Sequence, residues 1–115
     1  MPFKYYTAQY RYSGADRVDI TVKGQHPIGK IFAPTWNMVM GLKNSDIGWM
    51  EYCIEYADMM AKSCHDKPVE WMSILKSNGP LTFVCFCKEL QECHRWLLAG
   101  ILQKMGAEYL GEREL

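Results

Sequence analysis

The apolar segment LTFVCFC, residues 81–87, restricts the fold more than any other part of the sequence. It is rich in residue types that favour strands, and it places apolar side chains on both faces of a strand. A strand of this kind lies in the interior of a sheet whose two faces are covered by helices. We therefore predict that residues 81–87 form the central strand of a layered α/β domain.

Two further strands are predicted near the N-terminus. Residues 4–12, KYYTAQYRY, are rich in aromatic side chains and lead into the turn residues SGAD. In residues 17–23, RVDITVK, apolar and polar positions alternate as in a half-buried strand, and Asp19 and Thr21 fall on its polar side. Residues 24–34 contain two glycines and two prolines, which predicts a loop that is long enough to carry a function.

Helices are predicted in most of the remaining chain. The clearest pattern lies in residues 46–65, where apolar residues recur every three or four positions after Asp46, a residue type that can cap a helix. Further helices are predicted within residues 33–45, 68–77 and 93–106, and residues 107–112 are predicted to form a short edge strand. This order indicates one α/β domain over residues 1–115, small and three-layered, with a mostly parallel central sheet flanked by helices.

The composition is that of an ordinary folded protein with no excess charge. Thirteen basic residues balance thirteen acidic ones, which gives no reason to expect a non-specific nucleic-acid binder, although a local basic patch stays open. The five cysteines are odd in number and lie inside helical or strand patterns, which favours a reducing compartment over a disulfide framework. The sequence has neither a signal peptide pattern nor a run of about eighteen apolar residues. We therefore expect a cytoplasmic protein that does not bind membranes.

The most reactive residue types gather directly after the predicted central strand. In the stretch CFCKELQECHRW, Cys85 and Cys87 fall on one side of the strand. Cys93, His94 and Arg95 fall in the first turn of the helix that follows. Ligands of open α/β sheets bind beyond the carboxyl ends of the strands, where loops lead into helices. The sequence therefore predicts a site at this turn.

Four interpretations of the turn are open. In the first it binds zinc, since three cysteines and His94 are suitable ligand types, but their spacing lacks a C-x2-C pair. In the second, the free N–H groups of the helix N-terminus and the planar fork of Arg95 hold a phosphate or carboxylate. In the third, the helix terminus and Arg95 lower the pKa of Cys93 or Cys87 to make a nucleophile, with His94 as acid or base. In the fourth, these are ordinary core and surface residues.

Several blocks of the chain resemble the domain of unknown function 488 family. The main block is LTFVCFCKELQECHRWLLAGIL, and RVDITVKG, FAPTWNMVMGLK and GAEYLGE match the order of the other blocks. The resemblance implies an α/β fold and a soluble protein of a microbe or its phage, and it implies no reaction. Its blocks cover Arg17, Asp19, Thr21, Pro34, Trp36, Cys85, Cys93, His94 and Arg95. Cys87 departs from the family, many of whose members have a glutamate there.

These observations predict a pocket above the sheet that accepts an anionic ligand. Residues 24–34 would form its wall and residues 87–95 its floor. A phosphate-bearing small molecule, a nucleotide or a nucleic-acid end is the expected class, because aromatic side chains could stack a base. The candidate ligand-binding residues are Tyr10, Arg17, Thr21, Trp36 and Arg95. The candidate catalytic residues are Asp19, Cys87, Cys93 and His94.

A binding module is preferred to an enzyme, because binding needs only the anion site and the aromatic walls. The alternatives are a cysteine-dependent enzyme acting on a nucleotide or nucleic acid, and a structural zinc-binding or protein-interaction module. Neither a cofactor nor a bound metal ion is expected. The sequence leaves the oligomeric state open.

Overall fold

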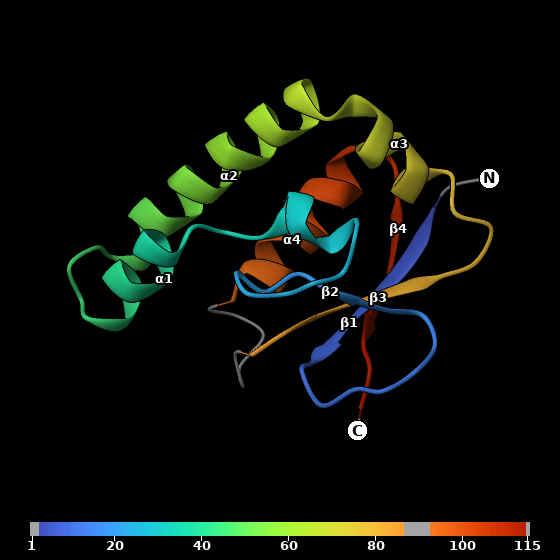
Figure 1. Ribbon diagram of the computed structural model, residues 1–115, viewed down its shortest axis with the longest axis horizontal. Helices are drawn as coiled ribbons and strands as arrows, with labels where there is room; N and C mark the ends of the chain where they lie inside the picture. Colours follow the sequence, from blue (N-terminus) through green and yellow to red (C-terminus); the bar gives the residue numbers. More distant parts are fainter. Residues whose placement is uncertain (1–2, 87–92, 115) are drawn as a thin grey trace.

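The strands of the protein form one parallel sheet (Figure 1). A computed structural model describes residues 3–86 and 93–114. The strands in this part of the chain are β1 (Lys4–Gln9), β2 (Arg17–Asp19), β3 (Leu81–Cys85) and β4 (Glu108–Glu112), in the order β2-β3-β1-β4. Both β1 and β2 pair with β3. The predicted α/β class is confirmed, and β3 lies inside the sheet as its apolar sequence indicates.

Helices occupy the chain between β2 and β3 and between β3 and β4. They are the short 3-10 helix η1 (Gly29–Phe32), α1 (Trp36–Lys43), α2 (Trp49–Asp66), α3 (Pro68–Leu75) and α4 (His94–Lys104). Thr35 caps α1, because its hydroxyl accepts a hydrogen bond from the Met38 N–H. The predicted cap of α2 at Asp46 is wrong: the Asp46 N–H donates to Gly41 O at the end of α1, and α2 starts after Gly48. No described helix is both long and apolar enough to cross a membrane.

β2 is shorter than its alternating sequence predicts. The pattern covers residues 17–23, but the strand ends at Asp19. There the carboxylate of Asp19 accepts hydrogen bonds from the N–H and the hydroxyl of Thr21, and the Gly24 N–H donates to Thr21 O. Such local bonds compete with the strand ladder and turn the chain. Asp19 and Thr21 are consequently buried.

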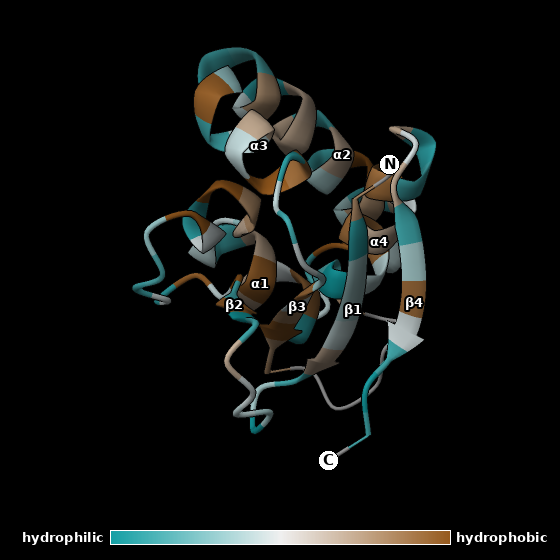
Figure 2. Ribbon diagram, turned by 90° about the vertical axis from the view of Figure 1, so that its right-hand side faces the viewer, coloured by the Kyte–Doolittle hydropathy of each residue, from teal (hydrophilic) through white to brown (hydrophobic). Residues whose placement is uncertain are grey.

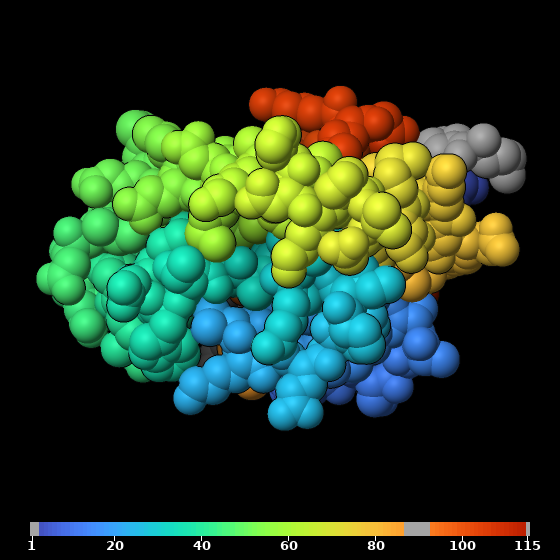
Figure 3. Space-filling view, turned by 45° about the horizontal axis from the view of Figure 1, so that its top comes forward, coloured from blue at the N-terminus to red at the C-terminus, as the bar shows by residue number. Residues whose placement is uncertain are grey.

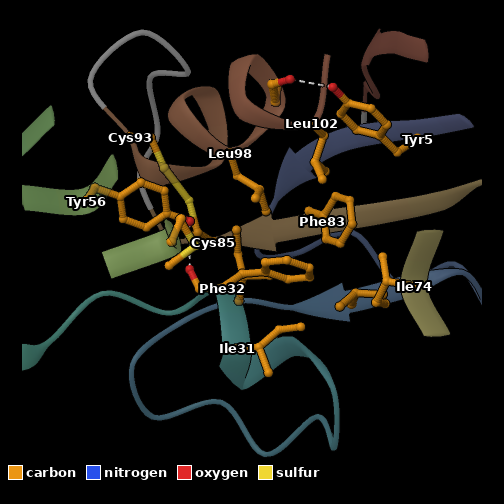
Figure 4. Close-up of a cluster of buried hydrophobic side chains, with 14 of the residues drawn as sticks. Tyr5, Ile31, Phe32, Tyr56, Ile74, Phe83, Cys85, Cys93, Leu98 and Leu102 are labelled. Atoms are coloured by element: carbon orange, nitrogen blue, oxygen red, sulfur yellow. Dashed lines mark hydrogen bonds between the residues drawn. A yellow bond between two sulfur atoms is a disulfide. The ribbon is translucent and has the colours of Figure 1, made fainter. Parts of the chain in front are cut away.

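The core lies between the sheet and the helices. Phe83 of β3 is fully buried and meets Phe32 of η1 and Tyr5 of β1 edge-on, at ring-centroid distances of 5.4 and 5.9 Å. On the same side, the Tyr5 hydroxyl donates to Ala99 O of α4, which lies behind β1 and β4 in Figure 2. Leu98 of α4 points into this cluster (Figure 4). These contacts place α4, and therefore its first turn, against the carboxyl end of β3.

The opposite face of the sheet is covered by a loop where a helix was expected. Tyr6 and Thr82 are neighbours on this face. Thr82 donates from its hydroxyl to Asp16 in the loop after β1, at 2.6 Å. Arg113, just beyond β4, donates to the Thr82 hydroxyl at 3.0 Å and stacks over Tyr6 at 3.8 Å. Within the described residues, the third layer is therefore made of loop and terminal residues.

Candidate functional site at the carboxyl end of the central strand

Two sulfur atoms meet where β3 runs toward α4. Cys85 is the last residue of β3, Cys93 is the N-cap residue of α4, and both are buried. Figure 4 draws their Sγ atoms as bonded. Their Cα atoms are 7.8 Å apart, whereas a disulfide usually spans about 4.4 to 6.8 Å between Cα atoms. The structure bonds the two sulfurs, although a disulfide of standard geometry would need the two backbones to approach.

Arg95 connects this sulfur pair to the last strand. Its side chain is fully buried, and Nη1 donates to Cys85 Sγ at 3.2 Å and to Cys93 Sγ at 3.3 Å. The other edge of the guanidinium donates to the Glu112 carboxylate, from Nε at 3.2 Å and from Nη2 at 2.7 Å. This is the two-toothed geometry of a strong arginine–carboxylate pair. The anion site predicted at Arg95 stays a prediction, and the guanidinium already holds one carboxylate of the protein itself.

Glu112 reaches Arg95 because β4 contains an irregularity. Tyr5 pairs with Tyr109, but Thr7 pairs with Glu112, so β4 has one residue more than β1 in this interval. Gly111 lies in this interval with a φ of 110°, a backbone conformation that residues other than glycine rarely adopt. The extra residue moves Glu112 to the helical face of the sheet. A glycine inside a strand pattern was the one sequence signal for this bulge.

His94 is a buried neutral base in this site. Its Nε2 lies 2.8 Å from Ile20 O, and burial lowers the pKa of His94 to about 4. A neutral imidazole bonded to a carbonyl carries its proton on the bonded nitrogen, so Nε2 donates and Nδ1 keeps the lone pair. Asp19 uses its carboxylate to hold the turn at Thr21 and makes no described hydrogen bond to His94.

A cavity of about 360 Å³ opens beside the sulfur pair. Its lining includes Thr21, Lys23, Trp36, Phe86, Cys93 and His94. In Figure 3 a hollow lies between the blue surface of the chain after β2 and the teal surface of α1. The cavity therefore lies beyond the carboxyl ends of β2 and β3, where ligands of parallel sheets usually bind.

Aromatic rings stand at the mouth of the cavity. Phe86, which is 66% exposed, stacks on Tyr10 at a centroid distance of 4.0 Å, and the Arg17 guanidinium lies over Tyr10 at 4.4 Å. On another wall, Trp36 is 51% exposed and Lys23 Nζ lies 4.9 Å from the centre of its ring. Tyr10 and Arg17, both candidate ligand-binding residues, thus support Phe86 and do not line the cavity in the described part of the chain.

The structure brings some of the candidate residues together and separates others. Those that share the cavity are Thr21, Trp36, Cys93 and His94. Arg95 lies one layer deeper, and Cys87 falls outside the described residues. Lys23, Phe86 and Glu112 are not among the residues predicted from the sequence. Of these, Phe86 adjoins the predicted strand and Lys23 ends the alternating segment, but neither residue type carries a signal for a pocket on its own.

The same cluster contains possible metal-ligand atoms. One ligand atom each of Cys85, Cys93 and His94 lies within 4.8 Å of the others. Thiolate and imidazole are ligands that zinc prefers. However, the positively charged Nη1 of Arg95 already lies at hydrogen-bond distance from both sulfurs, so a divalent cation there would be repelled.

We expect the protein, purified without chelator, to contain well under one equivalent of zinc. The guanidinium of Arg95 is the physical reason, because it supplies the positive charge that a metal would otherwise provide to the sulfurs. Elemental analysis by mass spectrometry measures this directly. Stoichiometric zinc that disappears in a Cys85→Ala, Cys93→Ala double variant would contradict the expectation.

A known family model matches most of the chain. The family model DUF488-N3a, described as the active DUF488-N3 subclade, matches residues 6–106. The matched part includes most of β1, all of β2, β3 and α4, and the cavity, and it ends before β4. Neither a curated protein nor a solved structure matches the chain.

Proposed function

The chain belongs to the DUF488 family, and on that premise we propose that its cavity binds a small ligand that combines a flat ring with an anionic group, such as a nucleotide or a nucleic-acid end. One observation carries the proposal: two exposed aromatic rings and a lysine stand at the mouth of one cavity at the carboxyl end of the sheet. Apolar cavities with a few polar groups are the usual form of a small-molecule site.

The aromatic walls favour a ring-shaped ligand. Phe86 is held from behind by Tyr10, and Tyr10 in turn is held by Arg17, which donates to the backbone carbonyls of Tyr10 and Tyr12 at 3.0 and 2.8 Å. A ring that is fixed in this way loses little freedom when a ligand stacks on it. Stacking of a base on an aromatic side chain contributes about 1 to 3 kcal/mol by alanine substitution.

Lys23 favours an anionic group on the ligand. It is exposed, it lines the cavity, and its ammonium lies against the Trp36 ring. A lysine in this position can contact a phosphate as a point charge while the ring of the ligand stacks below it. The Arg95 guanidinium is therefore not required for anion binding. The anion contact is expected at the mouth of the cavity and not at the helix terminus.

A cysteine-dependent enzyme is the second candidate function. Cys93 and His94 line the same cavity, so a bound ligand would touch a sulfur and a lone-pair nitrogen. The description of the matching family model as an active subclade supports this candidate. Binding and catalysis here would use one site, and the ligand proposal is common to both.

The ligand proposal predicts thermal stabilisation by nucleotides. A ligand at ten times its Kd stabilises the folded state by about 1.4 kcal/mol, which raises the Tm by several degrees in a domain of this size. Mononucleotides, dinucleotides and short single strands would be titrated to millimolar concentration. Lys23→Ala and Trp36→Ala should each lower the affinity severalfold for the compound that responds.

Lys62→Ala is the matched control, because Lys62 is an exposed lysine on α2 that does not line this cavity. It should leave the response unchanged. If no phosphate-bearing ring compound raises the Tm, or if Lys23→Ala and Lys62→Ala respond alike, the cavity does not have this function.

A further inference from the structure

We infer that in the reduced protein Cys93 is the nucleophile of this cavity, held as a thiolate by the guanidinium of Arg95 and by the thiol of Cys85. The inference rests on the proposed function for the ligand that Cys93 meets. It assigns different roles to the two cysteines, Cys93 as the nucleophile and Cys85 as a donor behind it.

The two sulfurs differ in how accessible they are from the cavity. Both accept a hydrogen bond from the same Nη1 atom of Arg95, at nearly equal distances of 3.2 and 3.3 Å. Cys93 lines the cavity, whereas Cys85 ends the interior strand β3 and has no exposed surface. A ligand in the cavity therefore meets Cys93 first, and Cys85 lies behind it.

Arg95 supplies the charge that a thiolate needs. An arginine side chain stays protonated at any ordinary pH, and a neighbouring cation lowers the pKa of a thiol. Glu112 occupies the Nε and Nη2 edge of the guanidinium, so the Nη1 edge is held toward the sulfurs. Glu112 thus fixes the direction in which Arg95 donates.

His94 does not supply this charge. A cysteine–histidine ion pair needs a protonated imidazole, and burial holds the pKa of His94 near 4. His94 is therefore neutral near pH 7, and its Nδ1 can accept a hydrogen bond from a bound ligand or water. The thiolate of Cys93 depends on Arg95, which distinguishes this site from one built on an imidazolium.

Cys85 adds a second donor. The two Sγ atoms are bonded in the structure, so reduction leaves them side by side: a protonated Cys85 can then donate its S–H to the Cys93 thiolate, and the pair holds one proton between two sulfurs. Pairs of neighbouring cysteines commonly have one thiol with a lowered pKa for this reason.

In the reaction, the Cys93 sulfur forms a bond to an electrophilic atom of the ligand. The bond from that atom to its leaving group breaks, and the leaving group takes the electron pair.

The experiment measures the alkylation of each cysteine in the full-length protein. The protein is kept reduced with a phosphine, treated briefly with iodoacetamide between about pH 5.5 and 9.5, and digested for mass spectrometry. Cys93 should react with an apparent pKa at least about one unit below the usual 8.5 of a free thiol. Cys53 and Cys64, which are unpaired and partly buried, are internal controls in the same molecule. At pH 7, Cys93 should react about tenfold faster than either control.

Two sets of variants test the two donors separately. Arg95→Lys keeps the charge but cannot reach Glu112 and both sulfurs together, so the apparent pKa of Cys93 should rise toward 8.5. Cys85→Ala leaves Arg95 in place and should raise this pKa by about one unit. Cys85→Ser retains a hydroxyl donor and should raise it less. Circular dichroism confirms that each variant is folded.

Three results would each overturn the inference. They are an apparent pKa of Cys93 at or above 8.5, preferential alkylation of Cys85, and a Cys85–Cys93 cross-linked peptide that the phosphine does not reduce. The assay contains no nucleotide. Its failure would therefore leave the ligand proposal standing, and failure of the thermal-shift assay would leave the nucleophile standing.

Discussion

Replacing Arg95 with alanine should lower the free energy of unfolding by about 2 to 4 kcal/mol. The Arg95 side chain has no exposed surface, and its loss would remove two hydrogen bonds to Glu112 and two to sulfur. Breaking a buried ion pair by removing one partner typically costs about 3 to 5 kcal/mol. The lower range applies because Glu112 keeps 27% of its side-chain surface in water and can be solvated. Chemical denaturation measures the change.

Lys4→Ala is the control for Arg95→Ala. Lys4 and Glu108 form another pair between the edge strand and its neighbour, but their charged atoms are 3.9 Å apart and about half of each side chain is exposed. An exposed pair contributes about 0 to 1 kcal/mol, so Lys4→Ala should change stability little. If Arg95 were a ligand-binding residue at the protein surface, Arg95→Ala would lower the free energy of unfolding by less than about 1 kcal/mol. A loss that small would show that the buried pair is not structural.

Leu98→Ala should lower the free energy of unfolding by about 2 to 5 kcal/mol. Leu98 is fully buried between α4 and the sheet, so truncation removes apolar contacts and leaves a cavity in a close-packed core. The change also loosens the helix whose first turn carries Cys93, His94 and Arg95. Urea denaturation followed by circular dichroism measures the loss.

Leu110→Ala tests whether burial causes the effect of Leu98→Ala. Leu110 lies in the edge strand β4 and is 38% exposed, so the same truncation removes fewer contacts and opens no enclosed space. The loss should be under about 1 kcal/mol. Equal losses for the two variants would mean that α4 is not anchored through Leu98.

Local pattern was sufficient to predict most of the elements. The period of apolar residues identifies α2 and α4, and the two-sided apolar run identifies β3, because burial on one or both faces restricts which positions can be polar. Element ends were predicted less well. β2 stops at Asp19 because a side-chain hydrogen bond replaces the strand ladder, and an alternating pattern continues through such a turn without change.

The sequence indicated where the candidate residues lie in the fold better than it indicated how their side chains are oriented. Ligand sites in parallel sheets lie where strands lead into helices, and the structure places Cys93 and His94 of the Cys-His-Arg triplet beside a cavity at such a turn. Arg95 was predicted to face a ligand, whereas its guanidinium is turned inward to Glu112 and the sulfurs. The helical period indicates which residues share a face of α4. It does not indicate which strand or side chain packs against that face.

By itself, the sequence determined the α/β class, the interior position of β3 and the turn at which cysteine, histidine and arginine lie together, because each of these follows from the residue types along a short segment. Only the tertiary structure decided which side chains face one another across that turn. Glu112 reaches Arg95 through a bulge at Gly111, in a strand seventeen residues further along the chain, and Phe86 and Lys23 meet around a cavity that α1 helps to enclose. Such pairings depend on how strands and helices pack, which is a property of the whole chain and of none of its segments.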